Sequence, residues 1–213
     1  MEISELFAFA VIIIGAYLAG SIPSGVILTK VFAGQDIRQQ GSGNIGATNV
    51  ARVAGMRLGL LTLALDMLKG GAPVYLAGRF GPGTGEAAMT LAALAAVGGH
   101  MYPAYSGFKG GGKGVATAGG CFLVLSPASC LAAIGVFALV AFLTRRVSAG
   151  SLAAALSLPV CVWFFSGQAG FVAGAGLVSL FVIIRHRENI VRLISGKESA
   201  FAFKRNKSTD KPS

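Results

Sequence analysis

The chain has 213 residues, of which 54% are hydrophobic and only 12% are charged. A soluble domain carries about twice that charged fraction, so the composition excludes a soluble protein and predicts a single membrane domain over residues 1–203. The formal net charge of +10 does not indicate a nucleic-acid partner, because Lys and Arg accumulate in the cytoplasmic loops of membrane proteins.

Seven apolar stretches predict an all-α fold, that of a polytopic membrane protein, because a helix needs roughly 20 mostly apolar residues to cross a bilayer. In chain order they cover 4–32, 57–78, 86–105, 115–125, 128–144, 151–165 and 169–184. The first is expected to bend at Gly20-Ser-Ile-Pro-Ser-Gly25, and Pro127 separates the fourth from the fifth. Merging neighbouring stretches gives five spans, which stays open as an alternative.

The basic residues set the expected orientation. With seven spans and the N-terminus outside, every basic loop and the C-terminus fall on the cytoplasmic side. Asp66 and Lys69 lie three residues apart within the second span and are expected to pair, since unpaired charge is costly inside a bilayer. Residues 185–196 are predicted to form a basic amphipathic helix at the interface, and 204–213 a disordered basic tail. The three cysteines lack metal-ligand spacing, so no metal or cofactor is predicted.

The first polar motif, GSGNIGATNVAR at 41–52, lies between the first two spans. Its glycines let the backbone turn N–H groups toward an anion, and a helix beginning near Val50 would add the charge of its N-terminus. Neutral donors and a guanidinium fork complete a phosphate-binding pattern: Ser42, Asn44, Thr48, Asn49 and Arg52. The alternative is a simple Gly/Asn-rich turn with one arginine.

The second motif, GFKGGGKGVAT at 107–117, matches the first part of a nucleotide-binding P-loop. Gly114 stands where that loop needs Ser or Thr, and no buried strand precedes it, so a nucleotide site is excluded. A glycine-rich backbone leading into a helix still favours an anion. The candidate phosphate-binding residues are Lys109, Gly110, Gly111, Gly112, Lys113 and Gly114. A merely flexible basic loop is the alternative.

The third motif, RHRENIVR at 185–192, follows the last span. His186 and Asn189 lie three apart and share one face of a helix, where Arg185 and Arg192 add charge. A histidine at a membrane edge can be a structural hydrogen-bonding group or a catalytic one, and both interpretations stay open. Ser148, just after Arg145 and Arg146, is one more candidate donor for the same pocket.

In their order and extent, these three motifs resemble the bacterial membrane glycerol-3-phosphate acyltransferases that use acyl-phosphate as donor. The motif GHMYP at 99–103 and the stretch RHRENIVRLISGKE at 185–198 extend the likeness over nearly the whole chain. The resemblance implies seven helices with the N-terminus outside, and a bacterial inner-membrane enzyme whose active site faces the cytoplasm. Its partners would be the bilayer, a fatty acyl-phosphate and glycerol 3-phosphate, with lysophosphatidic acid and phosphate as products.

The resemblance also implies residue roles. Ser42, Asn44 and Arg52 would contact substrate, Gly110 to Gly114 with Lys113 would bind the phosphate of glycerol 3-phosphate, and Ser148 beside Arg145 would lie at the site. His186 and Asn189 match the catalytic pair of the third motif, and Glu198 a structural glutamate. The family pattern has two glycines between its lysines and this chain has three, so either Lys109 or Lys113 holds the phosphate. Lys113 is favoured because Gly-Val-Ala-Thr follows it in register.

Two other functions compete with this one. A transporter of a phosphorylated or anionic solute would also use several spans, although it usually places polar groups near the bilayer midplane. A non-enzymatic scaffold leaves the polar loops unexplained. The chain lacks the His-x4-Asp pair of another acyltransferase class, since Tyr105 and Val191 stand five residues after its two histidines, which argues against a thioester donor. Acyl-chain preference, oligomeric state and the general base stay open, with His186 or a substrate phosphate oxygen as candidates for the base.

Overall fold

The computed structural model describes residues 2–81 and 85–200, so the predicted tail at 204–213 lies outside the described residues. Within these ranges the chain forms helices and no strand. The α-helices are α1 (Ile3–Ser21), α2 (Ser24–Ala33), α3 (Ala47–Ala54), α4 (Met56–Phe80), α5 (Glu86–Met101), α6 (Val115–Leu125), α7 (Pro127–Thr144), α8 (Val147–Phe165), α9 (Ala169–Arg185) and α10 (Arg187–Ile194). The all-α prediction is confirmed, and a helix lies at each of the seven predicted apolar stretches.

The apolar helices differ in how well they suit a membrane. Among the described residues, four segments are long and apolar enough to cross one, and the number rises to five if the bent pair of α9 and α10 counts as one span. One of the four joins α1 to α2. The helix α5 has only 16 residues and α6 only 11. Length and composition therefore establish four or five candidate spans and do not by themselves give seven.

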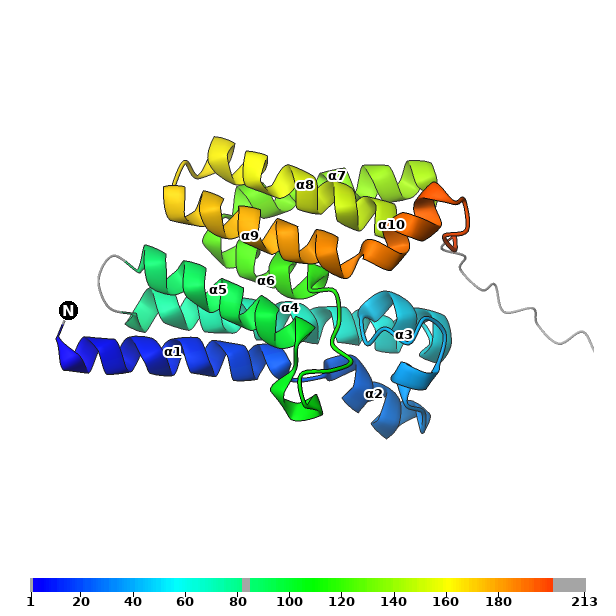
Figure 1. Cartoon of the computed structure of the whole chain (residues 1–213), viewed down its shortest axis with the longest axis horizontal. Coiled ribbons are helices and arrows are strands. Elements are labelled where there is room, and N and C mark those ends of the chain that lie inside the picture. The colour runs from blue at the N-terminus through cyan, green and yellow to red at the C-terminus, as the bar shows by residue number, and fades with distance from the viewer. Residues whose placement is uncertain (1, 82–84, 201–213) are drawn as a thin grey trace, which may run out of the picture.

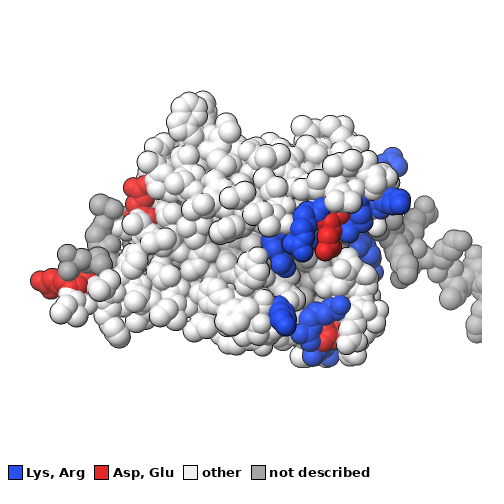
Figure 2. Space-filling model, viewed as in Figure 1, with Lys and Arg blue, Asp and Glu red and all other residues white. Residues whose placement is uncertain are grey.

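The long helices lie side by side along the longest axis of the molecule, while the short α2, α3 and α10 gather at one end (Figure 1). The helix α1 packs on α5 and α4, and α4 packs on α6. On the other side α8 packs on α7 and α9, and α9 meets α5 and α6. Lys and Arg are concentrated at the end that holds the short helices, and the opposite end carries acidic side chains (Figure 2). On the face shown, positive charge therefore lies at one end of the long helices and negative charge at the other.

Glycines allow the closest helix contacts. A Cβ on Gly20 of α1 would lie 2.0 Å from the carbonyl oxygen of Ala96 on α5, and one on Gly120 of α6 would lie 1.9 Å from that of Met67 on α4. No side chain fits at such distances, so the backbones touch directly. Packing through small residues is how helices associate where lipid removes the hydrophobic driving force between them.

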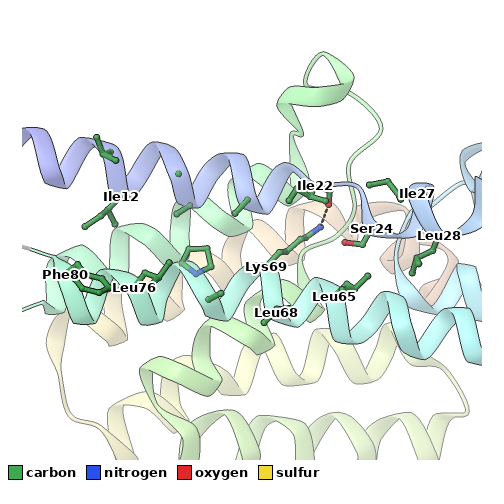
Figure 3. Close-up of a pocket in the computed structure, with 16 residues that line it drawn as sticks. Ile12, Ile22, Ser24, Ile27, Leu28, Leu65, Leu68, Lys69, Leu76 and Phe80 are labelled. Atoms are coloured by element: carbon green, nitrogen blue, oxygen red, sulfur yellow. Dashed lines mark hydrogen bonds between the residues drawn. The ribbon is translucent and has the colours of Figure 1, made fainter. Parts of the chain in front are cut away.

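The first predicted span contains two helices that meet at the stretch where the bend was expected. The helix α1 ends at Ser21, and α2 starts at Ser24 after Ile22 and Pro23, because proline cannot donate the hydrogen bond that would continue α1. Lys69 Nζ donates to the freed Ile22 carbonyl at 2.7 Å, as Figure 3 shows. The same ammonium lies 2.8 Å from Asp66 Oδ1, which confirms the predicted ion pair.

Lys69 also lines an apolar groove of about 670 Å³ between α4 and the first two helices (Figure 3). Its other lining residues are almost all aliphatic or aromatic, among them Ile12, Ile22, Leu65, Leu76 and Phe80. The groove holds no polar motif, so the candidate site lies elsewhere.

Candidate active site

A second cavity, of about 920 Å³, brings the three polar motifs together. Its polar lining comes from the loop before α3, the loop before α6, the start of α8 and the junction of α9 with α10. Its apolar lining comes from α6 to α9, with Phe122, Ile134, Phe137, Leu158 and Val178 as the larger side chains. One cavity thus offers donors and cations in one part and a hydrocarbon-like surface in another.

The first motif is held by Asn49, which is buried in α3. Its Oδ1 accepts from the backbone N–H of Ser42 at 3.0 Å, and its Nδ2 donates to the carbonyls of Gln40 at 3.0 Å and Asn44 at 2.9 Å. The Asn44 side chain in turn accepts from the N–H of Gly46 at 2.8 Å. The side chain of Asn49 is therefore occupied in ordering the loop.

Other residues of this motif are available to a ligand. Ser42, Thr48 and Arg52 line the cavity, and the Arg52 guanidinium makes no hydrogen bond or ion pair with any described residue. The first turn of α3 also faces the cavity, since Ala47 lines it next to Thr48. A helix N-terminus and a free guanidinium both attract anions.

The second motif crosses the end of α5 before α6 begins at Val115. The N–H of Gly112 donates to the His100 carbonyl at 3.1 Å, and Gly110, Gly111, Lys113 and Gly114 line the cavity. The first turn of α6 lines it as well. Of the two lysines of the motif, Lys113 lines the cavity and Lys109 does not.

The third motif supplies a chain of hydrogen bonds to Lys113. The Lys113 ammonium donates to Asn189 Oδ1, and Asn189 Nδ2 donates to Glu198 Oε1 at 2.6 Å. Arg192 Nε donates to the other oxygen of Glu198 at 2.7 Å. This network fixes the Lys113 side chain at the cavity wall and places Glu198 behind Asn189.

The protonation of this network follows from its burial. Burial lowers the pKa of Lys113 to about 8, although Glu198 opposes the shift. Burial by itself would raise the pKa of Glu198, but the neighbouring Ser148 hydroxyl and hydrogen bonds from Arg192 and Asn189 bring it below its usual value. At neutral pH the network therefore holds a charged lysine and a charged carboxylate.

His186 is held as a neutral imidazole. Its Nδ1 lies 2.8 Å from the carbonyl oxygen of Val182, and because a carbonyl only accepts, Nδ1 carries the proton. Burial lowers the pKa of His186 to about 4, against the effect of that hydrogen bond, and the charge of Lys113 adds to the shift. Nε2 is therefore unprotonated at neutral pH.

The cavity lining also includes residues from outside the three polar motifs and acidic residues not predicted as substrate contacts. Ser148, a predicted donor, lines the cavity with its buried hydroxyl next to the Glu198 carboxylate. Asp66, His100, Glu188 and Glu198 line it too. Nothing in the sequence placed Asp66 there, because it lies in the middle of an apolar span and only the packing of α4 on α6 brings it close.

Three predicted residues do not reach the cavity formed by the described residues. Lys109 is exposed on the loop, Gly112 is covered by the His100 ring, and Arg145 ends α7 with an exposed side chain. The sequence assigned them by proximity to the motifs, but adjacent loop residues can point in opposite directions. No cluster of three or more His, Cys, Asp or Glu side chains suited to a metal occurs in residues 2–81 and 85–200.

The fold and the site define a class of protein, a helical membrane protein whose cavity sets cations and polar donors beside an apolar wall. A family model for glycerol-3-phosphate acyltransferases matches residues 10–196. The chain is 51% identical over 194 residues to the glycerol-3-phosphate acyltransferase of Syntrophotalea carbinolica, covering 91% of this chain and 98% of the relative. It is 46% identical over 189 residues to that of Trichlorobacter lovleyi, covering 89% and 95%.

Two solved structures are also similar. Both are crystal structures of PlsY (YgiH), an integral membrane glycerol 3-phosphate acyltransferase. Its glycerol 3-phosphate form matches with a TM-score of 0.85 and 40% identity, over 93% of this chain and 96% of that one. Its lysophosphatidic acid form matches with a TM-score of 0.84 and 39% identity over the same shares.

The chain therefore belongs to the glycerol-3-phosphate acyltransferase family. This membership assigns it an acyltransferase activity at the first step of phospholipid synthesis, and the transporter alternative has no support.

Proposed function

We propose that the chain transfers a fatty acyl group from acyl-phosphate to the 1-hydroxyl of glycerol 3-phosphate, giving lysophosphatidic acid and phosphate. The observation that carries this proposal is the composite cavity, in which anion-binding motifs adjoin an apolar wall from α6 to α9. An acyl-phosphate has the same two-part chemistry, with a phosphate at one end and a hydrocarbon chain at the other. Relatives named for glycerol 3-phosphate, and a structure of one in its glycerol 3-phosphate form, support the acceptor.

The proposed acceptor site lies at the second motif. Lys113, Gly110, Gly111 and Gly114 bind the phosphate of glycerol 3-phosphate, and the buried Ser148 hydroxyl adds a donor. An ammonium held by Asn189 and the first turn of α6 give that phosphate fixed positive partners.

The proposed donor site lies at the first motif. Ser42, Asn44 and Arg52 hold the acyl-phosphate group, with Thr48 at the start of α3 beside them. The acyl chain lies along the apolar wall. Asn49, although predicted as a substrate contact, acts by ordering the loop, because its amide already binds three backbone groups.

In this arrangement the reaction needs no acyl-enzyme, because acyl-phosphate is already activated. The acceptor hydroxyl oxygen attacks the acyl carbon, the bond from that carbon to the phosphate oxygen breaks, and the hydroxyl proton ends on the released phosphate. His186 Nε2 can carry the proton between them, and so can a phosphate oxygen directly. Holding the reactants in contact contributes up to ~7–11 kcal/mol in favourable cases, and fixed cations stabilise the charge that develops.

The proposed topology has seven crossings, with the N-terminus outside and the active site at the cytoplasmic face of a bacterial inner membrane. Helices at all seven predicted stretches support it, as does the concentration of Lys and Arg at the end that holds the three motifs (Figure 2). Single cysteines placed at 42, 113 and 186 in a background without the native cysteines test it by thiol labelling of intact cells. All three should be protected from an impermeant reagent added outside.

The activity test uses purified protein in detergent or lipid with labelled glycerol 3-phosphate. Acyl-phosphate, acyl-CoA and acyl-carrier protein are offered separately. Product from acyl-phosphate alone supports the donor assignment, whereas product only from a thioester overturns it.

A further inference from the structure

Arg185 is the last residue of α9, at the point where the chain bends by 61° into α10. It does not line the cavity. Its Nε donates to the carbonyl oxygen of Gly112 at 3.1 Å, and its Nη2 donates to that of Gly111 at 2.8 Å. The guanidinium also lies over the ring of Tyr102, with 5.4 Å between its Cζ and the ring centroid. One side chain thus donates hydrogen bonds to two consecutive carbonyls of the glycine-rich loop.

The opposite side of that loop rests on the end of α5. The N–H of Gly112 donates to the His100 carbonyl at 3.1 Å. A Cβ at residue 111 would lie 2.1 Å from the Met101 carbonyl oxygen, and one at 112 would lie 2.0 Å from His100 Nε2. The loop is therefore held between two helix ends, with no space for a side chain on the α5 side.

Lys113 is the next residue after this held segment. Its ammonium meets Asn189, which lies four residues after Arg185 along the same bent helix pair. The junction of α9 with α10 therefore contacts the loop twice, once through the backbone before Lys113 and once through the Lys113 side chain. A shift of the backbone at residues 111 and 112 moves Lys113 directly.

We propose that Arg185 is a positioning residue for the acceptor: it holds the loop so that Lys113 meets the phosphate of glycerol 3-phosphate. This rests on the proposed function, which gives that phosphate to Lys113. Arg185 itself touches no substrate. Its carbonyl partners carry partial negative charge, and binding them to a guanidinium also reduces their repulsion of a nearby anion.

The geometry requires arginine rather than a generic cation. A planar guanidinium donates along two directions at once and stacks on an aromatic ring, while a lysine ammonium is a compact point charge that does not reproduce the fork. Arg185→Lys keeps the charge and loses the paired geometry. Arg185→Gln loses both. The matched control is Arg187→Gln, because Arg187 is exposed two residues further on and lies outside the cavity lining.

The test measures kcat and KM for each substrate with the purified full chain in detergent. A hydrogen bond to a charged group contributes about 1.5–3 kcal/mol, so Arg185→Gln should lower kcat/KM for glycerol 3-phosphate by roughly 10- to 100-fold. The KM for acyl-phosphate should stay within about twofold, because the first motif is held separately. Arg185→Lys should fall between Arg185→Gln and wild type, and Arg187→Gln should match wild type.

A double-mutant cycle shows whether Arg185 acts through Lys113. In a Lys113→Ala background, Arg185→Gln should lower the residual kcat/KM by less than about twofold, because the group it positions is gone. Equal losses in both backgrounds, or a loss shared by both substrates together with a lower melting temperature, would overturn the inference. Full activity of Lys113→Ala would instead reject the proposed acceptor site. If Lys113→Ala lost activity while Arg185→Gln kept the kcat/KM of the wild type, only the role of Arg185 would be rejected.

Discussion

The two glycine-rich loops of the cavity are held in different ways. The first is ordered by a residue of its own motif, Asn49, which binds backbone groups within nine residues of itself. Residues 111 and 112 of the second are held by groups from two helix ends, the His100 carbonyl of α5 and the Arg185 guanidinium of α9.

This difference shows what each loop depends on. The first keeps its shape as long as α3 forms, because its bonds are local. The second keeps its shape only if α5 and α9 pack together correctly. Changes to helix packing should therefore reach the acceptor site before they reach the donor site.

The largest effect is expected at the lysine that the second loop presents. Lys113→Ala should lower kcat/KM for glycerol 3-phosphate by about 10²–10³-fold, the usual cost of removing one preorganised group that stabilises developing charge. Lys109→Ala, which removes an exposed lysine outside the cavity, should stay within about twofold. Steady-state kinetics on both variants decides the register, and the reverse pattern would show that Lys109 holds the phosphate.

Adding one methyl group to the second loop tests its dependence on packing. A Cβ at Gly111 meets the Met101 carbonyl oxygen at 2.1 Å, so Gly111→Ala must displace the loop from α5. Overpacking typically costs about 1–3 kcal/mol of folding stability. Because moving the loop also moves Lys113, kcat/KM for glycerol 3-phosphate should fall by roughly tenfold, the equivalent of about 1.4 kcal/mol. Gly98→Ala on α5 is the control, because a Cβ there has no neighbour within 4 Å. Equal activity of Gly111→Ala and Gly98→Ala would contradict the close contact between the second loop and α5.

Removing the internal bonds of the first loop should affect the other substrate. Asn49→Ala deletes three hydrogen bonds worth about 0.5–1.5 kcal/mol each, and the KM for acyl-phosphate should rise by roughly tenfold or more. Asn49→Asp keeps the acceptor for the Ser42 N–H and loses both donors, so its KM for acyl-phosphate should lie between those of the wild type and Asn49→Ala. A rise in the glycerol 3-phosphate KM alone would mean that the loops are assigned to the wrong substrates.

The smallest effect is a pH dependence confined to the second loop. Burial lowers the pKa of Lys113 to about 8, so its ammonium is present below pH 8 and is lost above it. Since the anionic acceptor binds the charged form, kcat/KM for glycerol 3-phosphate should fall about tenfold between pH 7 and pH 9. Lys113→Arg should flatten this limb, because arginine stays charged. An alkaline limb that survives in Lys113→Arg would belong to another group.

The sequence was most informative where structure is local. Apolar runs predicted a helix at each of seven stretches, and the spacing of Asp66 and Lys69 predicted their ion pair, because residues three apart meet on any helix. The Gly20–Gly25 stretch was expected to bend the first span, and α1 gives way to α2 there. One boundary was placed too late, because α5 ends at Met101 and Pro103 follows closely, whereas the predicted stretch ran to 105. The sequence also identified the three motifs whose residues line the cavity.

Tertiary structure decided which residues of each motif line the cavity. Three glycines between two lysines leave the direction of each side chain undetermined, and only the contact of residues 111 and 112 with α5 turns Lys113 inward. In the sequence, Arg185 is one more positive charge at a membrane edge, but the carbonyls that it binds lie 73 and 74 positions away along the chain. Periodicity and composition report on neighbours within a few residues, whereas the second loop is held by two helix ends that meet only when the bundle packs.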